Sequence, residues 1–169
     1  MGCGKTTLGE ALAREMGVRY IDLDEHIEQQ CGMTIAEIFD KMGENRFREL
    51  ECEALREVAV MTDIIVGCGG GTPCHGDNMA LMNQAGITVW LTTSPERITA
   101  RLLLPEQRAK RPKFIGLPDE AFLPLVEQEL AARTPFYSQA RLQFDSTDIE
   151  TGPATVRTAR RLDRLLKTD

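Results

Sequence analysis

The stretch that decides the fold is residues 1–7, Met-Gly-Cys-Gly-Lys-Thr-Thr, and a helical pattern follows it. Leu8, Leu12 and Met16 recur at helical spacing, and Gly17 ends the run. Glycines let backbone N–H groups turn inward toward an anion, and the N-terminus of the following helix adds a partial positive charge. The stretch therefore predicts a phosphate-binding loop that leads directly into a helix.

Gly4-Lys5-Thr6 matches the end of the P-loop pattern Gly-x-x-x-x-Gly-Lys-Ser/Thr, which lies between a strand and a helix. Lys5 is then placed to neutralise the β- and γ-phosphates of a nucleotide, and the Thr6 hydroxyl to coordinate Mg²⁺. The bland alternative is a glycine-rich tail ahead of a helix, because a match this short also arises by chance.

The first glycine of the pattern would fall upstream of Met1, and so would the strand that carries the loop. We therefore expect the natural protein to have roughly ten further residues there, about one strand plus Gly-x. In P-loop kinases this strand is the central one. A chain without it should expose two strand edges and a face of the core.

Helical and strand patterns alternate along the rest of the chain, which predicts an α/β domain with a central parallel sheet flanked by helices in three layers. The expected strands are 18–23, 63–67, 87–91 and 142–145. The expected helices after the first are 34–42, 44–60, 77–84, one that begins at Ser94-Pro95-Glu96, 119–133 and 153–166. Residues 104–118 contain three prolines and four cations, and we interpret them as a mobile lid. We find no repeat or linker, and predict a single domain over residues 1–169.

The composition narrows the class of protein. The net charge of −6 argues against non-specific nucleic-acid binding. The sequence has no apolar run of about 18 residues, the length that would predict a membrane span. No secretory signal is visible, and the five scattered cysteines fit reduced thiols better than a disulfide framework or a zinc site. We therefore expect a cytoplasmic monomer that binds neither nucleic acid nor membranes.

Two carboxylates, Asp22 and Asp24, come at the end of the first predicted strand. Ligands of an open α/β sheet bind outside the carboxyl ends of its strands, and period-two alternation would put both side chains on one side. One carboxylate could hold Mg²⁺ through water, and the other could orient or deprotonate an acceptor hydroxyl. The alternative is a pair of strand-end aspartates that cap the next helix at Glu25.

Three further features lie downstream. Gly69, Gly70 and Gly71 follow a buried strand, where bare backbone would let a small ligand approach closely. Arg48 lies in a helical segment, where it could also pair with Glu44 or Glu51 on a solvated face. Arg133 is expected to end a helix, where a cation is also favourable on electrostatic grounds alone.

In this order and spacing, the motifs resemble those of the shikimate kinase family over nearly the whole chain. The resemblance is carried by residues 1–7, Asp22-Leu23-Asp24, Phe47-Arg48-Glu49, Gly69-Gly70-Gly71, Arg111-Pro112 and Arg133-Thr134-Pro135-Phe136-Tyr137. It implies a P-loop kinase fold and transfer of phosphate from ATP, with Mg²⁺, to the 3-hydroxyl of shikimate. That reaction is a step toward chorismate and the aromatic amino acids.

The resemblance also implies a role for each matching residue. Lys5, Asp24 and Arg111 would act in catalysis, and Thr6 and Asp22 would hold the hydrated metal. Shikimate would be bound by Asp24, Arg48, Gly69, Gly70, Gly71 and Arg133. The nucleotide would be bound by Gly2, Cys3, Gly4, Lys5, Thr6, Thr7, Arg101, Arg111 and Pro153. Planar guanidinium groups such as those of Arg48 and Arg133 suit a substrate carboxylate.

Other functions stay open at this point. A kinase similar to gluconate kinase would also take a substrate with a carboxylate and several hydroxyls. A nucleoside monophosphate kinase would need a pocket for a base and more arginines. A nucleotide-binding pseudokinase would bind ATP without turnover of shikimate.

Overall fold

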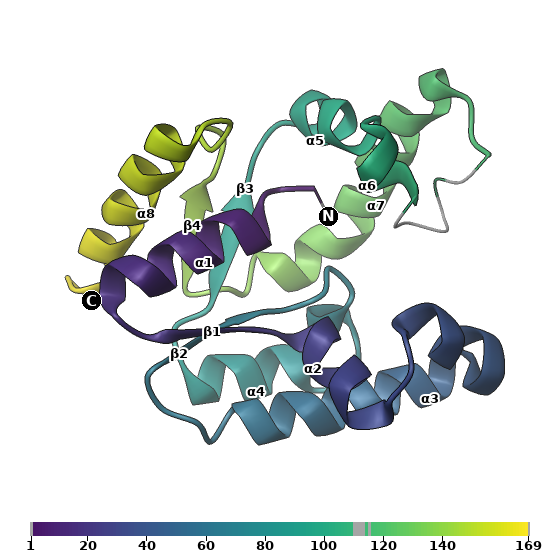
Figure 1. Ribbon diagram of the computed structural model, residues 1–169, viewed down its shortest axis with the longest axis horizontal. Helices are drawn as coiled ribbons and strands as arrows, with labels where there is room; N and C mark the ends of the chain where they lie inside the picture. The colour runs from purple at the N-terminus through teal and green to yellow at the C-terminus, as the bar shows by residue number, and fades with distance from the viewer. Residues whose placement is uncertain (1, 110–113, 115, 169) are drawn as a thin grey trace.

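The structure is a computed structural model and describes residues 2–109, 114 and 116–168 (Figure 1). The strands are β1 (Arg19–Asp22), β2 (Ile64–Gly67), β3 (Val89–Thr92) and β4 (Leu142–Asp145). The α-helices are α1 (Lys5–Met16), α2 (Leu23–Cys31), α3 (Ile35–Val58), α4 (Asn78–Ala85), α5 (Pro95–Leu102), α6 (Pro105–Ala109), α7 (Phe122–Tyr137) and α8 (Gly152–Leu166). Short 3₁₀ turns are η1 (Thr72–Cys74) and η3 (Asp119–Ala121).

The strands form two parallel pairs. β1 pairs with β2 so that Asp22 lies opposite Gly67, and β3 pairs with β4 so that Thr92 lies opposite Asp145. Within each pair the carboxyl ends therefore meet at one edge. The predicted α/β class with parallel strands flanked by helices is confirmed, but the described residues form two separate pairs rather than one continuous sheet.

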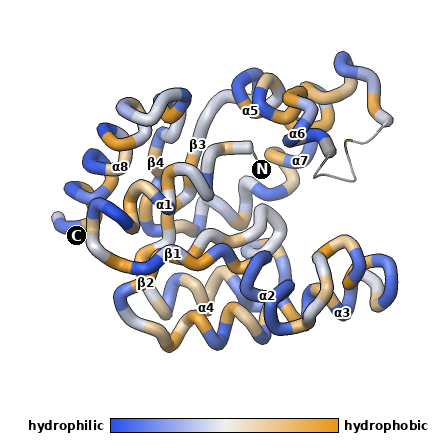
Figure 2. The backbone as a smooth tube through the Cα atoms, viewed as in Figure 1, coloured by the Kyte–Doolittle hydropathy of each residue, from blue (hydrophilic) through white to orange (hydrophobic). Residues whose placement is uncertain are grey.

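Each pair has its own apolar core. Side chains of α2 and α3, with Leu23, Phe47 and Leu55 among them, pack against β1 and β2. Leu8 and Leu12 of α1 pack with α8 and with Phe144 of β4. α1 and α8 lie side by side in Figure 1, and Figure 2 shows hydrophilic residues on the outer turns of α8. β2 contributes to both cores, with Ile64 and Val66 in the first and Ile65 in the second.

Most predicted boundaries hold closely, but two sites differ, and α2 and α6 are not among the expected helices. The strand expected over 18–23 ends at Asp22, and Asp24 lies in the first turn of α2. The two carboxylates are therefore not alternating strand residues, because Asp22 accepts the N–H of Asp24 and so starts the helix. The predicted helices 34–42 and 44–60 lie within α3 on either side of Gly43, whose φ of 80° breaks the helix. The capping box of Thr34 and Glu37 is confirmed.

The second correction concerns Arg133, which does not end a helix. α7 continues through Pro135 to Tyr137. A proline predicts a stop, but the last turn is held by the bond from the Ser138 N–H to the Thr134 carbonyl and by a tertiary contact of Tyr137. Local propensity is overridden by packing at this point.

The segment interpreted as a lid, 104–118, is described only in part. It contains α6, and Phe114 is buried in a cluster with Leu102 of α5 and Phe122 of α7. Arg108 pairs with Asp119 at 2.9 Å and lies over the Phe122 ring. Arg111 lies outside the described residues. Within the described part of the chain, no helix is long and apolar enough to cross a membrane.

Candidate active site

The phosphate loop depends on two glycines with left-handed backbone. Gly2 has φ 62° and Gly4 has φ 89°, values that L side chains rarely adopt. Gly4 is the N-cap of α1 and supplies no side-chain cap, so the first N–H groups of the helix are left for a ligand. The loop is fixed by its carbonyls: that of Gly2 accepts from Arg101 at 3.0 Å, and that of Cys3 from Ser146 at 2.9 Å.

Asp22 connects the loop to the acceptor side. One carboxylate oxygen forms an ion pair with Lys5 and lies 3.4 Å from the Thr6 hydroxyl, while the other accepts the N–H of Asp24 at 3.1 Å. Burial lowers the pKa of Lys5, but the Asp22 carboxylate and Tyr20 together outweigh burial and the pKa is raised overall. Lys5 is thus a permanent cation at the N-terminus of α1.

Asp24 is the carboxylate with the unusual environment. Burial, reinforced by the negative charge of Asp22, raises the pKa of Asp24 from 3.8 to about 6. Its oxygen lies beside Gly69, so a Cβ on that glycine would approach it to 3.3 Å. A carboxylate with a pKa near neutrality is suited to accept a proton from a substrate.

Arg48 is held by a buried carboxylate. Its guanidinium pairs with Glu51 at 2.8 Å and with Glu44 at 3.1 Å, and Glu51 is only 1% exposed. Glu51 also accepts a hydrogen bond from the Thr72 hydroxyl at 2.5 Å, which connects Arg48 to the end of residues 69–71, the glycine loop. A Cβ on Gly71 would lie 3.0 Å from the guanidinium. Both helical partners considered from the sequence are thus real, but the Glu51 pair is part of the site rather than of a solvated face.

Arg133 reaches the same loop through α7. It pairs with Glu129 one turn earlier in the helix. One turn later, Tyr137 donates to the Gly70 carbonyl at 2.6 Å. The structure therefore brings Asp24, Arg48 and the helix of Arg133 to the one glycine loop. The sequence analysis missed Glu51, Thr72 and Tyr137 as supporting residues.

The residues predicted to bind the nucleotide differ in how they lie relative to the phosphate loop. Arg101 contacts the loop and also pairs with Glu150 at 2.6 Å, and Ile149 packs against Gly4. Pro153 lies exposed in the first turn of α8. Arg101 and Ile149 thus border the phosphate loop, and a contact of Pro153 with the adenine stays a prediction.

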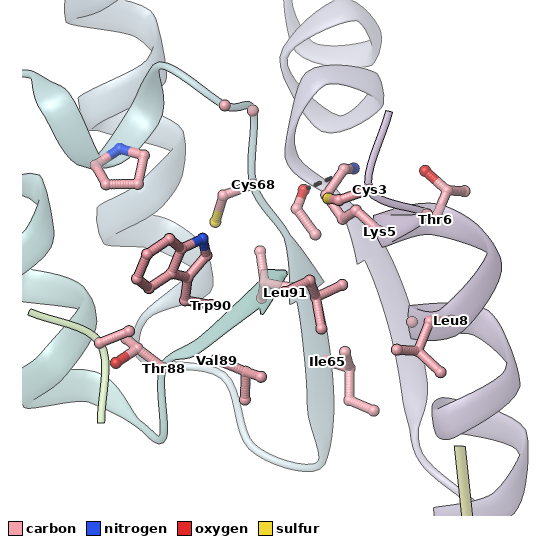
Figure 3. A pocket seen from close by; sticks show the side chains of 18 of the residues that line it. Cys3, Lys5, Thr6, Leu8, Ile65, Cys68, Thr88, Val89, Trp90 and Leu91 are labelled. Carbon is pink, nitrogen blue, oxygen red and sulfur yellow. Dashed lines mark hydrogen bonds between the residues drawn. The ribbon is translucent and has the colours of Figure 1, made fainter. Parts of the chain in front are cut away.

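A cavity of about 1300 Å³ joins these features. It is lined at one end by the phosphate loop, Asp24, the glycine loop and Arg133, and it continues between β2 and β3. Figure 3 shows Lys5, Cys3 and Thr6 at one side of this space, Trp90 and Cys68 toward the other side, and Leu91 and Ile65 between them. The described residues contain no cluster of three His, Cys, Asp or Glu side chains that could coordinate a metal ion.

A glycine-containing loop that opens a helix, a cationic lysine and a half-buried carboxylate at the carboxyl ends of parallel strands are typical of nucleotide-dependent phosphotransferases of the P-loop type. A family model described as "Shikimate kinase" matches residues 1–162. The chain belongs to the shikimate kinase family, as predicted from its motifs.

Relatives in sequence and structure agree with that membership. The shikimate kinase of Bacteroides thetaiotaomicron is 41% identical over 99% of this chain and 94% of that protein, and that of Phocaeicola vulgatus is 44% identical over 89% and 85%. A crystal structure of the Bacteroides thetaiotaomicron enzyme superposes with a TM-score of 0.93 over 99% of this chain and 94% of that one. The Acinetobacter baumannii shikimate kinase in complex with shikimate, 30% identical, has a TM-score of 0.84 over 99% of this chain and 89% of that one.

Proposed function

We propose that this chain transfers the γ-phosphoryl group of ATP to the 3-hydroxyl of shikimate and yields shikimate 3-phosphate and ADP. The observation that carries the proposal is the convergence of Asp24, Arg48 and the helix of Arg133 on the glycine loop 69–71, next to Lys5. A gluconate-kinase-like function is not favoured, because the family and the relative solved with shikimate agree with this acceptor.

On the ATP side, Lys5 and the N–H groups of residues 2–7 would hold the β- and γ-phosphates. Their charges are fixed before the substrate arrives, so little reorganisation is needed as negative charge develops on the transferring group. Arg101, held between the Gly2 carbonyl and Glu150, would border the base. A role of Arg111 in covering the phosphates stays a prediction, as does a contact of Pro153 with the adenine.

Mg²⁺ would be held by Thr6 and Asp22, and the residues fit that ion. A hydroxyl and a carboxylate oxygen 3.4 Å apart are hard oxygen donors, and Mg²⁺ usually takes only one or two protein ligands beside waters and phosphate oxygens. When bound, the ion would neutralise charge on the phosphates. Lys5 and Asp22 form an ion pair, so the lysine would exchange its carboxylate partner for phosphate when the nucleotide binds.

On the acceptor side, Arg48 and Arg133 would bind the shikimate carboxylate, and Asp24 would bind its hydroxyls. The Nε–H of Arg48 is buried and has no hydrogen-bond partner in the described part of the chain, so the guanidinium keeps donor capacity for an anion. Glu51 would keep the Arg48 guanidinium oriented. Glu44, which lies at the surface, would be replaced as its partner by the substrate carboxylate.

In the transfer, a bond forms between the acceptor 3-oxygen and the γ-phosphorus, and the bond from that phosphorus to the β–γ bridging oxygen breaks. The hydroxyl proton passes to Asp24, and ADP leaves with the electron pair. The transition state is loose, so positioning by the arginines and charge stabilisation by Lys5 would contribute more than proton removal.

We further propose that the enzyme works as a monomer in the cytoplasm. The five cysteines are all free, which agrees with a reducing compartment.

The direct test is ADP release with shikimate or gluconate as acceptor, with and without a chelator of Mg²⁺. Shikimate-dependent release that the chelator abolishes is expected. Arg133→Ala should mainly raise the KM for shikimate, and Asp24→Asn should mainly lower kcat. Binding of ATP without turnover of shikimate would instead support a pseudokinase, and wild-type turnover in both variants would overturn the residue assignment.

A further inference from the structure

Tyr20 lies beside the phosphate-binding lysine but has no part in the proposed transfer. It belongs to β1, and its hydroxyl lies 3.4 Å from the Lys5 ammonium and 3.5 Å from the Asp22 carboxylate. A phenolic hydroxyl can accept one hydrogen bond while it donates another, so it can bridge the ion pair of Lys5 and Asp22. Both contacts are long, as is common in active sites before the substrate binds.

Two glycines leave the space that the Tyr20 side chain occupies. A Cβ at Gly67, the last residue of β2, would overlap the Tyr20 hydroxyl and would lie 2.9 Å from the Lys5 nitrogen. A Cβ at Gly9 of α1 would lie 2.5 Å from the ring. Neither glycine has a positive φ, so close packing and not backbone conformation requires them. The hydroxyl therefore has a fixed place next to Lys5.

The partners of the Lys5 ammonium are of two kinds. The group has three N–H donors, and its partners are the Asp22 carboxylate, the Tyr20 hydroxyl and the Gly67 carbonyl, the last at 3.4 Å. In the proposed function Asp22 would hold Mg²⁺, and a phosphate oxygen would take its place on Lys5. The two neutral acceptors can stay, because neither carries a charge that competes with the phosphate. Partners that stay keep the ammonium oriented before and during the reaction.

We propose that Tyr20 is a positioning residue whose hydroxyl keeps Lys5 directed at the β- and γ-phosphates once Asp22 has turned to the metal ion. The proposal rests on the ATP side of the proposed function and does not depend on the acceptor. Tyr20 acts through Lys5 and need not touch the nucleotide. Its contribution should be small while the Asp22 carboxylate still holds the lysine, and larger when Mg²⁺ has engaged that carboxylate.

The test is the affinity of the full chain for an ATP analogue with an imido group between the β- and γ-phosphorus, measured with Mg²⁺ and with a chelator. Tyr20→Phe removes the hydroxyl and keeps the ring between α1 and β2. We expect the Kd of the Mg²⁺ complex to rise by about 5-fold in this variant, and that of the metal-free analogue by less than about 2-fold. Tyr137→Phe, at the other tyrosine of the chain, is the matched control and should leave both Kd values unchanged.

Gly67→Ala tests the same contact from the other strand. Its Cβ would compete for the place of the Tyr20 hydroxyl, so the Kd of the Mg²⁺ complex should rise by about 10-fold or more. Gly86→Ala, whose Cβ meets nothing within 4 Å, should bind like the wild type. In the double variant with Tyr20→Phe the overlapping hydroxyl is gone, so Gly67→Ala should add only about 3-fold or less. Two effects that multiply in full would contradict the proposal.

Wild-type affinity of Tyr20→Phe in Mg²⁺ overturns the proposal. An equal loss of affinity with Mg²⁺ and with chelator also overturns it, because the hydroxyl would then support the fold of the loop and not the orientation of Lys5. Shikimate-dependent ADP release is a separate measurement. Binding of the Mg²⁺ complex without such release would contradict the proposed acceptor and leave the role of Tyr20 to the Kd values, whereas a wild-type chain that does not bind the complex would overturn both proposals.

Discussion

Tyr137 donates a hydrogen bond of 2.6 Å to the carbonyl oxygen of Gly70. This bond joins two segments that are 67 residues apart, the helix that carries Arg133 and the glycine loop after β2. The Tyr137 ring also packs on Trp90 of β3, with centroids 5.9 Å apart. The position of Arg133 relative to the glycine loop is thus set by a tyrosine that need not touch the substrate.

Tyr137→Phe removes this bond and keeps the aromatic contact with Trp90. A hydrogen bond of this kind contributes about 1 kcal/mol, so we expect the KM for shikimate to rise by about 5-fold. The KM for ATP should change little, because the phosphate loop has its own anchors at Arg101 and Ser146. Steady-state kinetics with each substrate varied separately checks this. An equal rise of both KM values would show that Tyr137 supports the fold in general and does not position Arg133.

Gly71→Ala tests the close approach of Arg48 to the glycine loop. The backbone at Gly71 is right-handed helical, with φ −90° and ψ −21°, so alanine is not excluded by conformation. Its Cβ would lie 3.0 Å from the guanidinium of Arg48 and would displace it. We expect the KM for shikimate to rise by about 10-fold or more, on the order of 1.4 kcal/mol.

Gly86→Ala is the matched control, because nothing lies within 4 Å of a Cβ at that glycine and its backbone is extended. It should leave the KM for shikimate near the wild-type value. If both alanine variants behave alike, the effect at Gly71 comes from the loss of glycine flexibility and not from the contact with Arg48.

The nucleotide side yields a third prediction, at Arg101. Its guanidinium donates to the Gly2 carbonyl and is paired with Glu150. Arg101→Ala should raise the KM for ATP by about 10-fold, since one charge-assisted bond to the loop is worth about 1.5–3 kcal/mol and part of it is replaced by water. Glu150→Gln, which removes only the half-exposed carboxylate charge, should have a smaller effect. A change in the KM for shikimate instead would contradict the assignment of Arg101 to the nucleotide.

Much of the fold follows from local patterns. Gly17, the capping box at Thr34 and Ser94-Pro95 mark helix ends through their own backbone chemistry, and the structure confirms each of them. Long-range relations are beyond such patterns. Pro135 predicts a stop from the sequence because the tertiary support of its helix is invisible there.

The residues of the candidate site likewise divide into those that local motifs predict and those whose role depends on long-range packing. Residues that would touch ligands, such as Lys5, Asp24 and Arg48, are predicted from their order and spacing. Glu51 enters from the sequence only as a possible surface partner of Arg48, three residues away on the helix. Its burial and its bond to Thr72 depend on packing against a segment that comes 21 residues later, and no local pattern reports this.

The last prediction concerns the pH dependence of activity and of stability at Asp24. Its pKa is raised to about 6, mainly by burial and then by Asp22, so below that pH the enzyme would lack the proton acceptor that we propose for it. The value of kcat/KM should fall with decreasing pH through about 6. Asp24→Asn should lower kcat by about 100-fold or more, within the range of a positioned acid or base, and should remove this limb of the profile.

The same shift has the opposite consequence for stability. Because the folded state binds this proton more tightly than the unfolded state does, stability falls as pH rises from about 4 to about 6 and stays lower above. An asparagine side chain cannot ionise, so Asp24→Asn should stabilise the protein by about 1–2 kcal/mol at pH 8, after allowance for solvent screening, and by little at pH 4. Denaturant unfolding of both proteins at the two pH values checks this. A variant that is less stable at pH 8 would mean that the Asp24 carboxylate is stabilised in the fold by partners that outweigh its burial, and its assignment as a proton acceptor with a raised pKa would be wrong.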